Sequence, residues 1–295
     1  MLKFKKVELS DINALSLALE RYSGRVCDYS PGNAVFWRNH YDISYHLAGN
    51  SLVLRYGNMG EAECFSYPVA DDPSYIIKEL ISEGGAPICL CCLTEEQLQK
   101  VSADFEVCEI KHSEDWDDYL YDKNDIVSLA GRKFSGQRNH INKFKKLYPE
   151  ARFETITKDN AQVAKKFCIE YFDHIGKVTD VSDTEREQLI EQFDNWEAYS
   201  QLGGMLISEG RVVGISVGEI VGDTLIIHTE KADTSFDGAY PMLVNCFARE
   251  FAADDKCLYI NREEDCGIEG LRISKRSYHP IEIIKKYAVI IKELS

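Results

Sequence analysis

The order of predicted helices and strands repeats along this chain, and the repeat limits the folds it can adopt. Apolar alternation, helical periodicity and turn residues predict β-α-β-β-β-α-β-α-β on each side of a basic segment, 131–146. The first copy is expected at 4–7, 11–22, 34–41, 43–47, 52–56, 63–69, 73–82, 86–93, 95–102 and 105–111. The second is expected at 152–156, 160–175, 183–199, 202–208, 211–220, 224–232, 242–252, 257–260, 268–275 and 281–291. Two copies of one order predict two α/β domains with mixed sheets.

Capping and turn residues support these boundaries. Ser10, Thr94 and Ser135 each precede an amphipathic run and are expected to cap a helix. Pro73 suits the first turn of the helix that it opens. Glu209 and Gly210 predict a tight turn between two strands of the second copy.

Three antiparallel strands followed by α-β-α-β are the plan of the Gcn5-related N-acyltransferase fold. We therefore expect a tandem of two such domains, the first at 1–112 and the second at 151–295, with a basic linker and helix at 113–150. The domain boundary is expected between 112 and 150, and the second copy is expected to hold the functional site.

The basic segment differs from the rest of the chain in charge. It carries six Lys or Arg and no carboxylate, whereas the whole chain has a net charge of -15. An island of positive charge on an acidic protein indicates an anionic ligand at that place, and Arg138 is expected to face a cleft. The alternative is a solvated helix face, with Ile141, Phe144 and Tyr148 on its buried side.

Composition narrows the class of protein. The chain has 295 residues, of which 44% are hydrophobic and 28% charged, as in ordinary globular proteins. Its apolar runs are far shorter than a membrane span, and its first residues contain no apolar signal core. Ten cysteines lie largely in apolar stretches, and the one CxxC, Cys89 to Cys92, has no second half to complete a zinc site. We expect reduced thiols, no metal and a cytoplasmic location.

Four motifs carry a family resemblance. FWRNHYDISYHL, FSGQRNHINKF, IIHTEKAD and YINREEDCGIEGLRISKRSYHP together resemble a bacterial family that shares its domain with the C-terminal part of phosphatidylglycerol lysyltransferases. The resemblance implies a tandem acyltransferase fold related to Fem-type aminoacyl transferases. It also implies aminoacyl-tRNA as a donor, whereas the membrane-embedded half of the lysyltransferases has no counterpart in this sequence. Arg138 and Asn139 of the second motif are expected to bind ligand.

The segment SFDGAY corresponds to the coenzyme A loop of Gcn5-type enzymes, where helix N–H groups hold the pyrophosphate. Gly238 fits that loop, but Ser235 replaces its basic or amide residue and Tyr240 replaces its last small one. Gly238 and Tyr240 are expected either to bind the donor or to form an ordinary loop with a packing aromatic ring.

A histidine and a glutamate end the strand at 224–232. Alternation places His228 and Glu230 on one face, where the pair could position or deprotonate an amine. Glu230 is the candidate base. The alternative is a pair of polar cross-strand contacts at the sheet surface.

The segment NREED follows the short apolar strand at 257–260, and such strand ends bind ligands in α/β sheets. Asn261 and Glu263 are expected to bind ligand, Arg262 to hold an anionic part of the donor, and Asp265 to steer a cationic amine. The alternative is a local knot of ion pairs. A second basic cluster then follows at helical spacing and consists of Arg272, Lys275, Arg276 and His279. We expect it to bind phosphate.

Together these patterns predict a transferase of acyl or aminoacyl groups acting on an amine or hydroxyl of a small-molecule acceptor. The donor is expected to be aminoacyl-tRNA, bound through the basic patch, or acyl-CoA. The alternatives are a conventional acyl-CoA N-acyltransferase and a binding module that kept the fold without catalysis.

Overall fold

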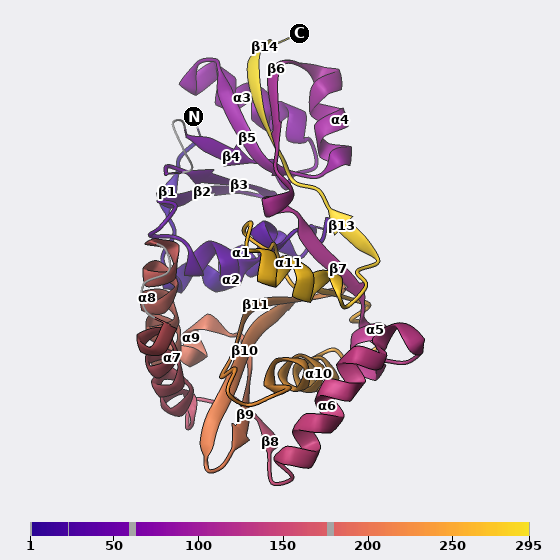
Figure 1. Ribbon diagram of the computed structural model, residues 1–295. Helices are drawn as coiled ribbons and strands as arrows, with labels where there is room; N and C mark the ends of the chain where they lie inside the picture. The colour runs from indigo at the N-terminus through magenta and orange to yellow at the C-terminus, as the bar shows by residue number, and fades with distance from the viewer. Residues whose placement is uncertain (1, 23, 59–62, 176–179, 295) are drawn as a thin grey trace. The chain divides into compact units, whose positions relative to one another are not determined.

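The fold contains two seven-stranded mixed sheets (Figure 1). The computed structural model describes residues 2–22, 24–58, 63–175 and 180–294. The chain divides into two compact units that are discontinuous in sequence. Unit 1 comprises Met1–Tyr119, Glu263–Arg272 and Ile283–Ser295, and unit 2 comprises Leu120–Arg262 and Ile273–Glu282.

The first sheet has the strand order β1-β2-β3-β4-β5-β14-β6. Its strands are β1 (Lys5–Lys6), β2 (Ile43–Ala48), β3 (Ser51–Tyr56), β4 (Cys64–Ser66), β5 (Ile88–Leu93), β6 (Phe105–His112) and β14 (Tyr287–Leu294). The helices that lie between these strands along the chain are α1 (Ile12–Leu19), α2 (Pro31–Phe36), α3 (Pro73–Gly84) and α4 (Glu95–Asp104). Strands β1 to β4 are antiparallel, and β4 pairs with β5 in parallel.

Local sequence explains most helix ends in unit 1. Thr94 caps α4 in a capping box with Gln97, as its sequence predicted, and Pro73 opens α3 behind the cap of Asp72. The predicted cap at Ser10 is wrong: a short 3-10 turn, Leu9–Asp11, comes first and leaves Asp11 at the N-cap of α1.

The second sheet has the strand order β13-β7-β12-β11-β10-β9-β8. Its strands are β7 (Asp118–Asp122), β8 (Arg152–Thr155), β9 (Leu202–Ser208), β10 (Arg211–Val221), β11 (Thr224–Ala232), β12 (Tyr259–Asn261) and β13 (Glu282–Ile284). The helices are α5 (Lys123–Ser128), α6 (Ser135–Leu147), α7 (Ala161–Ile175), α8 (Asp180–Asp194), α9 (Trp196–Tyr199), α10 (Ala239–Phe251) and α11 (Glu269–Arg276). Strands β8 to β11 are antiparallel, and β11 pairs with β12 in parallel.

Helices cover both faces of the second sheet in unit 2, with α7 and α8 on one side and α10 and α6 on the other (Figure 1). Phe144 of α6 is fully buried and packs with Leu206, Val213 and Leu243, and Ile141 is also buried. The predicted apolar face of the basic helix is therefore confirmed. The predicted cap at Ser135 is wrong, because Phe134 occupies the N-cap and Ser135 is the first helical residue.

The two sheets repeat one plan, so the predicted mixed α/β tandem fold is confirmed. In each sheet four antiparallel strands lead to one parallel strand, β5 or β12. The strand beyond that position comes from a distant part of the sequence: β14 pairs with β5, and β7 pairs with β12. The halves thus exchange strands, whereas the expected segments 1–112 and 151–295 are contiguous.

The segment expected as a linker and the last expected strand differ from the prediction. The range 113–150 contains β7 and α5 in addition to the basic helix. The strand predicted at 281–291 is interrupted at Lys285 and Lys286 and forms β13 and β14 in different sheets. The turn at Glu209 and Gly210 is confirmed, since both residues have positive φ, 51° and 73°.

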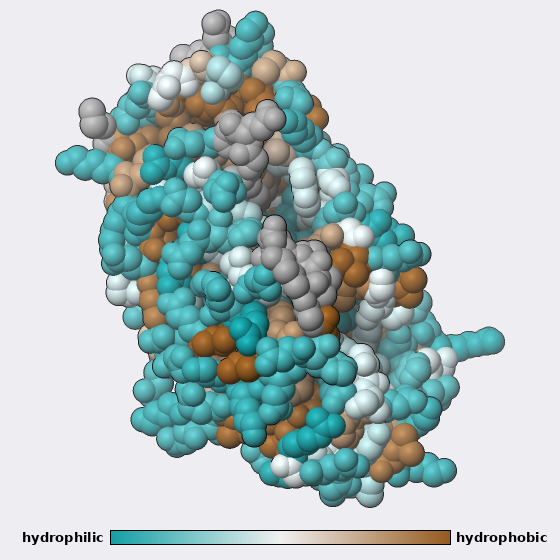
Figure 2. Space-filling model, turned by 60° about the vertical axis from the view of Figure 1, so that its left-hand side comes forward, coloured by the Kyte–Doolittle hydropathy of each residue, from teal (hydrophilic) through white to brown (hydrophobic). Residues whose placement is uncertain are grey.

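Within the described ranges, no helix is long and apolar enough to cross a membrane. The face of the molecule in Figure 2 is mostly hydrophilic, with separate hydrophobic patches.

Candidate functional site

A buried ion pair joins β11 to the residue that follows β12 in unit 2. Nε and Nη2 of Arg262 donate to the same oxygen of Glu230, Oε2, at 3.0 and 2.7 Å. The Arg262 side chain is 4% exposed and that of Glu230 is 12% exposed, so Glu230 reaches the surface and Arg262 barely does. Burial opposes the guanidinium charge, but the attraction of Glu230 raises the pKa of Arg262 above its ordinary value.

The strand geometry explains this contact. Parallel pairing between β11 and β12 ends at Ile226 and Asn261, while β11 continues to Ala232. Beyond that point the two strands no longer share hydrogen bonds, and the Glu230 and Arg262 side chains bridge them. Asn261, the last residue of β12, is fully buried.

Three polar atoms at this place are buried without a hydrogen-bond partner within the described parts of the chain. They are Oε1 of Glu230, Nη1 of Arg262 and Oγ of Ser216. Ser216 of β10 pairs directly with Glu230 in the antiparallel register, so the two side chains share one face of the sheet. Buried polar atoms are nearly always satisfied, and such a group of unsatisfied atoms indicates that a ligand or water completes them.

Aromatic rings and a lysine hold Arg262 in place. The guanidinium carbon lies 4.7 Å from the ring centre of Tyr278 and 5.9 Å from that of Tyr121. Nζ of Lys275 donates to the Arg262 carbonyl at 2.5 Å, and the Tyr121 hydroxyl donates to the Lys275 carbonyl at 2.8 Å. Lys275 was predicted to bind phosphate, but it is 8% exposed and supports the backbone at Arg262.

His228 has a different partner from the one predicted. Its Nε2 lies 2.9 Å from Oε1 of Glu219 on β10, and both side chains are about nine-tenths buried. A bulge in the β10–β11 ladder lies at this place, between the pairs Val217–Thr229 and Gly218–Ile227. The bulge separates the His228 contact from the Glu230 contact, so each residue binds its own neighbour.

The carboxylates after Arg262 belong to unit 1 and are all engaged there. Asp265 is fully buried and accepts two hydrogen bonds from Arg272 at 2.8 Å and one from Tyr119 at 2.6 Å. Burial alone would raise the pKa of Asp265, but the bond from Arg272 holds it below the usual range. Glu263 accepts from Asn33 at 3.2 Å. Asp265 and Arg272, predicted to steer an amine and to hold an anion, thus bind one another.

Helix α10 begins differently from a coenzyme A loop. Gly238 has φ of +86°, and a Cβ at this position would lie 2.4 Å from the His140 carbonyl oxygen of α6. The backbone N–H groups of Ala239 and Met242 are bonded within the turn, and Pro241 has none. Few first-turn N–H groups therefore remain for a pyrophosphate, and Gly238 serves the close approach of α6.

The Tyr240 hydroxyl reaches a cluster around Lys231 that the sequence did not reveal. This hydroxyl lies 3.3 Å from that of Tyr171, and burial raises its pKa. Lys231 binds Glu185 at 2.9 Å, and its ammonium lies 5.9 Å from the Tyr171 ring. Because neighbouring strand residues face opposite ways, this cluster anchors α7 and α8 on the face that Glu230 does not use.

The basic helix α6 is partly neutralised. Arg138 donates to the carbonyls of Leu129 and Gly131 at the end of α5, rather than facing a ligand. Lys133 and Lys143 bind Asp125 and Asp237. Three exposed cations of the island have no ion-pair partner in the described chain: Arg132, Lys145 and Lys146. Asn139 is also exposed.

Unit 1 contains a second buried ionic cluster that the sequence did not reveal. Nζ of Lys286 lies 2.8 Å from Asp28, 2.9 Å from Asp118 and 3.3 Å from Glu264. Burial alone would lower the pKa of Lys286. The neighbouring carboxylates outweigh burial and hold this pKa well above its usual value. Cys27, Asp118 and Glu264 lie close enough to hold a metal, but the Lys286 ammonium already occupies the position between these carboxylates.

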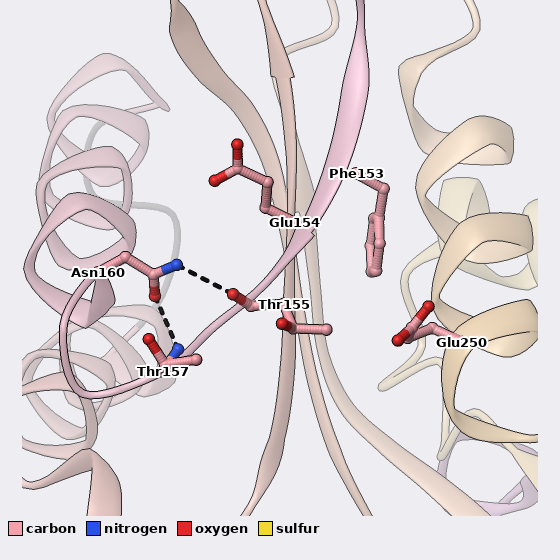
Figure 3. Close-up of a pocket in the computed structure, with 6 residues that line it drawn as sticks. All are labelled: Phe153, Glu154, Thr155, Thr157, Asn160 and Glu250. Atoms are coloured by element: carbon pink, nitrogen blue, oxygen red, sulfur yellow. Dashed lines mark hydrogen bonds between the residues drawn. The ribbon is translucent and has the colours of Figure 1, made fainter.

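A shallow depression of about 470 Å³ in unit 2 lies elsewhere, at the edge strand β8 (Figure 3). Asn160 there accepts from the N–H of Thr157 and donates to the carbonyl of Thr155, so its polar atoms are satisfied. None of the predicted site residues lines it, and its six lining residues are Phe153, Glu154, Thr155, Thr157, Asn160 and Glu250.

The chain matches a family model over residues 19–290. The model describes the C-terminal part of phosphatidylglycerol lysyltransferase. The match covers most of the chain, so this protein belongs to that family, as its motifs predicted.

Several known proteins are similar to this chain in sequence or fold. A solved protein of unknown function from Bacteroides thetaiotaomicron is 32% identical, with a TM-score of 0.92 over 99% of this chain and 100% of that one. L-PGS from Bacillus licheniformis shares the fold at 13% identity, with a TM-score of 0.66 over 99% of this chain and 95% of that one. An uncharacterised protein of Mycoplasmoides gallisepticum is 27% identical over 202 residues, 67% of this chain. The match spans 63% of that curated relative's length.

Proposed function

From this membership, we propose that the protein transfers an aminoacyl group to an amine or hydroxyl acceptor, with its site at Glu230 and Arg262 of unit 2. The observation that carries the proposal is the ion pair itself, which leaves one carboxylate oxygen and one guanidinium N–H buried and without a bond to any described residue. A purely structural pair would gain by satisfying both atoms, because unsatisfied buried groups destabilise a fold.

The chemistry of the three unsatisfied atoms matches an aminoacyl ester. Such an ester carries an ammonium group beside a carbonyl, so it offers a cationic donor and an acceptor at adjacent carbons. Oε1 of Glu230 would accept from the ammonium, and Nη1 of Arg262 would donate to the carbonyl oxygen as it becomes an oxyanion. The Ser216 hydroxyl could serve either group. A plain acyl group has no ammonium and would leave the Glu230 oxygen unsatisfied.

In this proposal, the role of Glu230 differs from the catalytic base that its sequence predicted. Glu230 is bound to Arg262, so it orients the ammonium rather than removing a proton. The acceptor attacks the ester carbonyl, a new N–C or O–C bond forms, and the bond to the donor's ribose oxygen breaks. The proton of the acceptor passes through water to the ribose oxygen as that oxygen leaves. His228 is bonded to Glu219 and has no role in this step.

The start of α10 supports an aminoacyl donor over acyl-CoA. Pro241 lacks an N–H, and two other first-turn amides are already bonded. A coenzyme A pyrophosphate needs several such groups together. Arg132, Lys145 and Lys146 have no ion-pair partner among the described residues, and they suit the phosphates of a tRNA donor.

The test compares two donors with one nucleophile. The protein is incubated with tRNA charged with labelled amino acids, or with acetyl-CoA, and hydroxylamine serves as a surrogate acceptor. We expect accelerated formation of aminoacyl hydroxamate and no release of free coenzyme A. Glu230→Gln should lower the rate by about two to four orders of magnitude, since it removes the charge that orients the ammonium.

The matched control is Glu154→Gln, which removes an exposed carboxylate on the edge strand of the same sheet. It should leave the rate unchanged. Turnover of acetyl-CoA that survives Glu230→Gln would overturn the proposal, and binding of charged tRNA without any turnover would favour a binding module.

A further inference from the structure

Two neighbouring strands of unit 1 bring cysteines together. Cys64 begins β4, while Cys89 and Cys91 lie on β5, its parallel neighbour. The register pairs Cys64 with Cys89 and Ser66 with Cys91, so all three thiols lie on one face of the sheet. The Sγ atoms of Cys64 and Cys89 are 2.7 Å apart.

This distance is shorter than that of ordinary packing. Non-bonded heavy atoms prefer about 3.5–4.0 Å, whereas a disulfide bond measures about 2.0 Å. Neighbouring strands lie about 4.8 Å apart, which falls within the Cα separation that a disulfide tolerates. Both cysteines are reduced in the structure, and the separation of their sulfurs lies between these two distances.

We propose that Cys64 and Cys89 are a redox-active pair that a small peroxide converts to a disulfide. The proposal does not rest on the aminoacyl transferase function, because both cysteines belong to unit 1 and the site at Glu230 belongs to unit 2.

The environment assigns a role to each sulfur. Hydrogen bonding with the Cys89 thiol, followed by that with Cys91, lowers the pKa of Cys64 below its usual value. The same bond raises the pKa of Cys89, which keeps its proton. We assign Cys64 as the nucleophile and Cys89 as the resolving thiol, because the two sulfurs are in contact and one can attack the other once it is oxidised.

The reaction balances in two steps. The Cys64 thiolate attacks one peroxide oxygen, the O–O bond breaks, and with one proton a sulfenic acid and water form. The sulfur of Cys89 then attacks the sulfenic sulfur, the S–O bond breaks, the Cys89 proton leaves with the hydroxyl group as water, and the disulfide forms. Two thiols are oxidised by two electrons while one peroxide is reduced to two waters.

Access favours a small oxidant. Cys64 and Cys89 are 6% and 7% exposed, so hydrogen peroxide reaches them more readily than a bulky reagent does. Cys108 and Cys266 are exposed and provide an internal comparison. The link would join β4 directly to β5 and restrict the unfolded chain between them, so the oxidised protein should melt at a higher temperature.

The experiment treats the reduced full-length chain with one to five equivalents of hydrogen peroxide, then alkylates it under denaturing conditions. We expect eight alkylated cysteines in place of ten, a mass loss of two hydrogens, and a peptide that links Cys64 to Cys89. A reducing thiol should restore all ten. The Cys108→Ser variant should still form the link, whereas Cys64→Ser and Cys89→Ser should not.

The peptide map of the oxidised wild-type protein tests the pair even if a variant fails to fold. Loss of other thiols while Cys64 and Cys89 stay alkylated would overturn the proposal. So would oxidation of Cys64 to a sulfinic acid with Cys89 still reduced, because a resolving thiol would have prevented that product.

Discussion

Two buried ionic clusters, one in each unit, differ in how their polar atoms are completed. Around Lys286 in unit 1, one ammonium contacts three carboxylates, and Asp118 also accepts the backbone N–H of Cys27 at 2.7 Å. Around Glu230 in unit 2, one guanidinium meets one carboxylate, and an atom of each has no partner within the described residues.

The difference separates a structural role from a functional one. A cluster whose polar atoms are bonded within the chain stabilises the fold and offers little to a ligand. A cluster that keeps a donor and an acceptor unbonded destabilises the fold and gains by binding. Burial and charge alone do not distinguish the two, because both lie deep in their units.

The largest expected effect is on the stability of the Lys286 cluster. Lys286→Met leaves three carboxylates without their common cation, so the free energy of unfolding should fall by about 3–5 kcal/mol. Urea denaturation followed by circular dichroism measures it. The matched control is the exposed neighbour, Lys285→Met, which should change stability by less than about 0.5 kcal/mol.

An equal effect of the two lysine variants would break the comparison, since the buried lysine would then be no more important than a surface one.

A smaller and opposite effect is expected at Ser216. Its hydroxyl is buried and unbonded, so Ser216→Ala should leave the free energy of unfolding unchanged or raise it by up to about 1 kcal/mol. The same change should slow aminoacyl transfer roughly tenfold, because one hydrogen bond to the substrate is lost.

Ser208 is the matched control for that change. It is also buried in the second sheet, but its hydroxyl donates to Glu150 at 2.8 Å. Ser208→Ala should therefore lower stability by about 1 kcal/mol and leave the transfer rate alone. A destabilised Ser216→Ala with normal activity would show that the hydroxyl has a structural partner.

The smallest expected effect is on how the stability of the protein depends on pH through Asp265. The folded-state pKa of Asp265 lies below its unfolded value, so its contribution is present above about pH 4 and is lost as pH falls through the folded pKa. Asp265→Asn removes this proton linkage, so melting temperature should fall less steeply between about pH 4 and pH 2 than in the wild type.

The Asp255→Asn variant changes an exposed carboxylate and should keep the wild-type slope. Identical acid profiles for all three proteins would mean that Arg272 does not favour the ionised form of Asp265.

The residues of the candidate site were partly predictable. Polar residues at strand ends indicated Glu230 and Arg262 from the sequence alone, because ligands bind where strands of an α/β sheet end. The sequence did not reveal that Asp265 would bind Arg272 in unit 1, seven residues along the chain. It also gave no signal for Glu219, Ser216 or Lys286, since a lone polar residue in an apolar run does not indicate which residue it will contact.

By itself, the sequence determined most of the helices and strands, but not β7 or α5. Hydrophobic period, caps and turns act over a few residues, so the hairpin of β2 and β3, the cap at Thr94 and the buried face of α6 could be predicted. Only the tertiary structure decided that β14 completes the first sheet and β7 the second. Alternation shows that a segment is a strand, but its hydrogen-bonding groups are the same as those of every other strand. The choice of partner therefore depends on side-chain packing across the sheet, which forms between residues far apart in the chain.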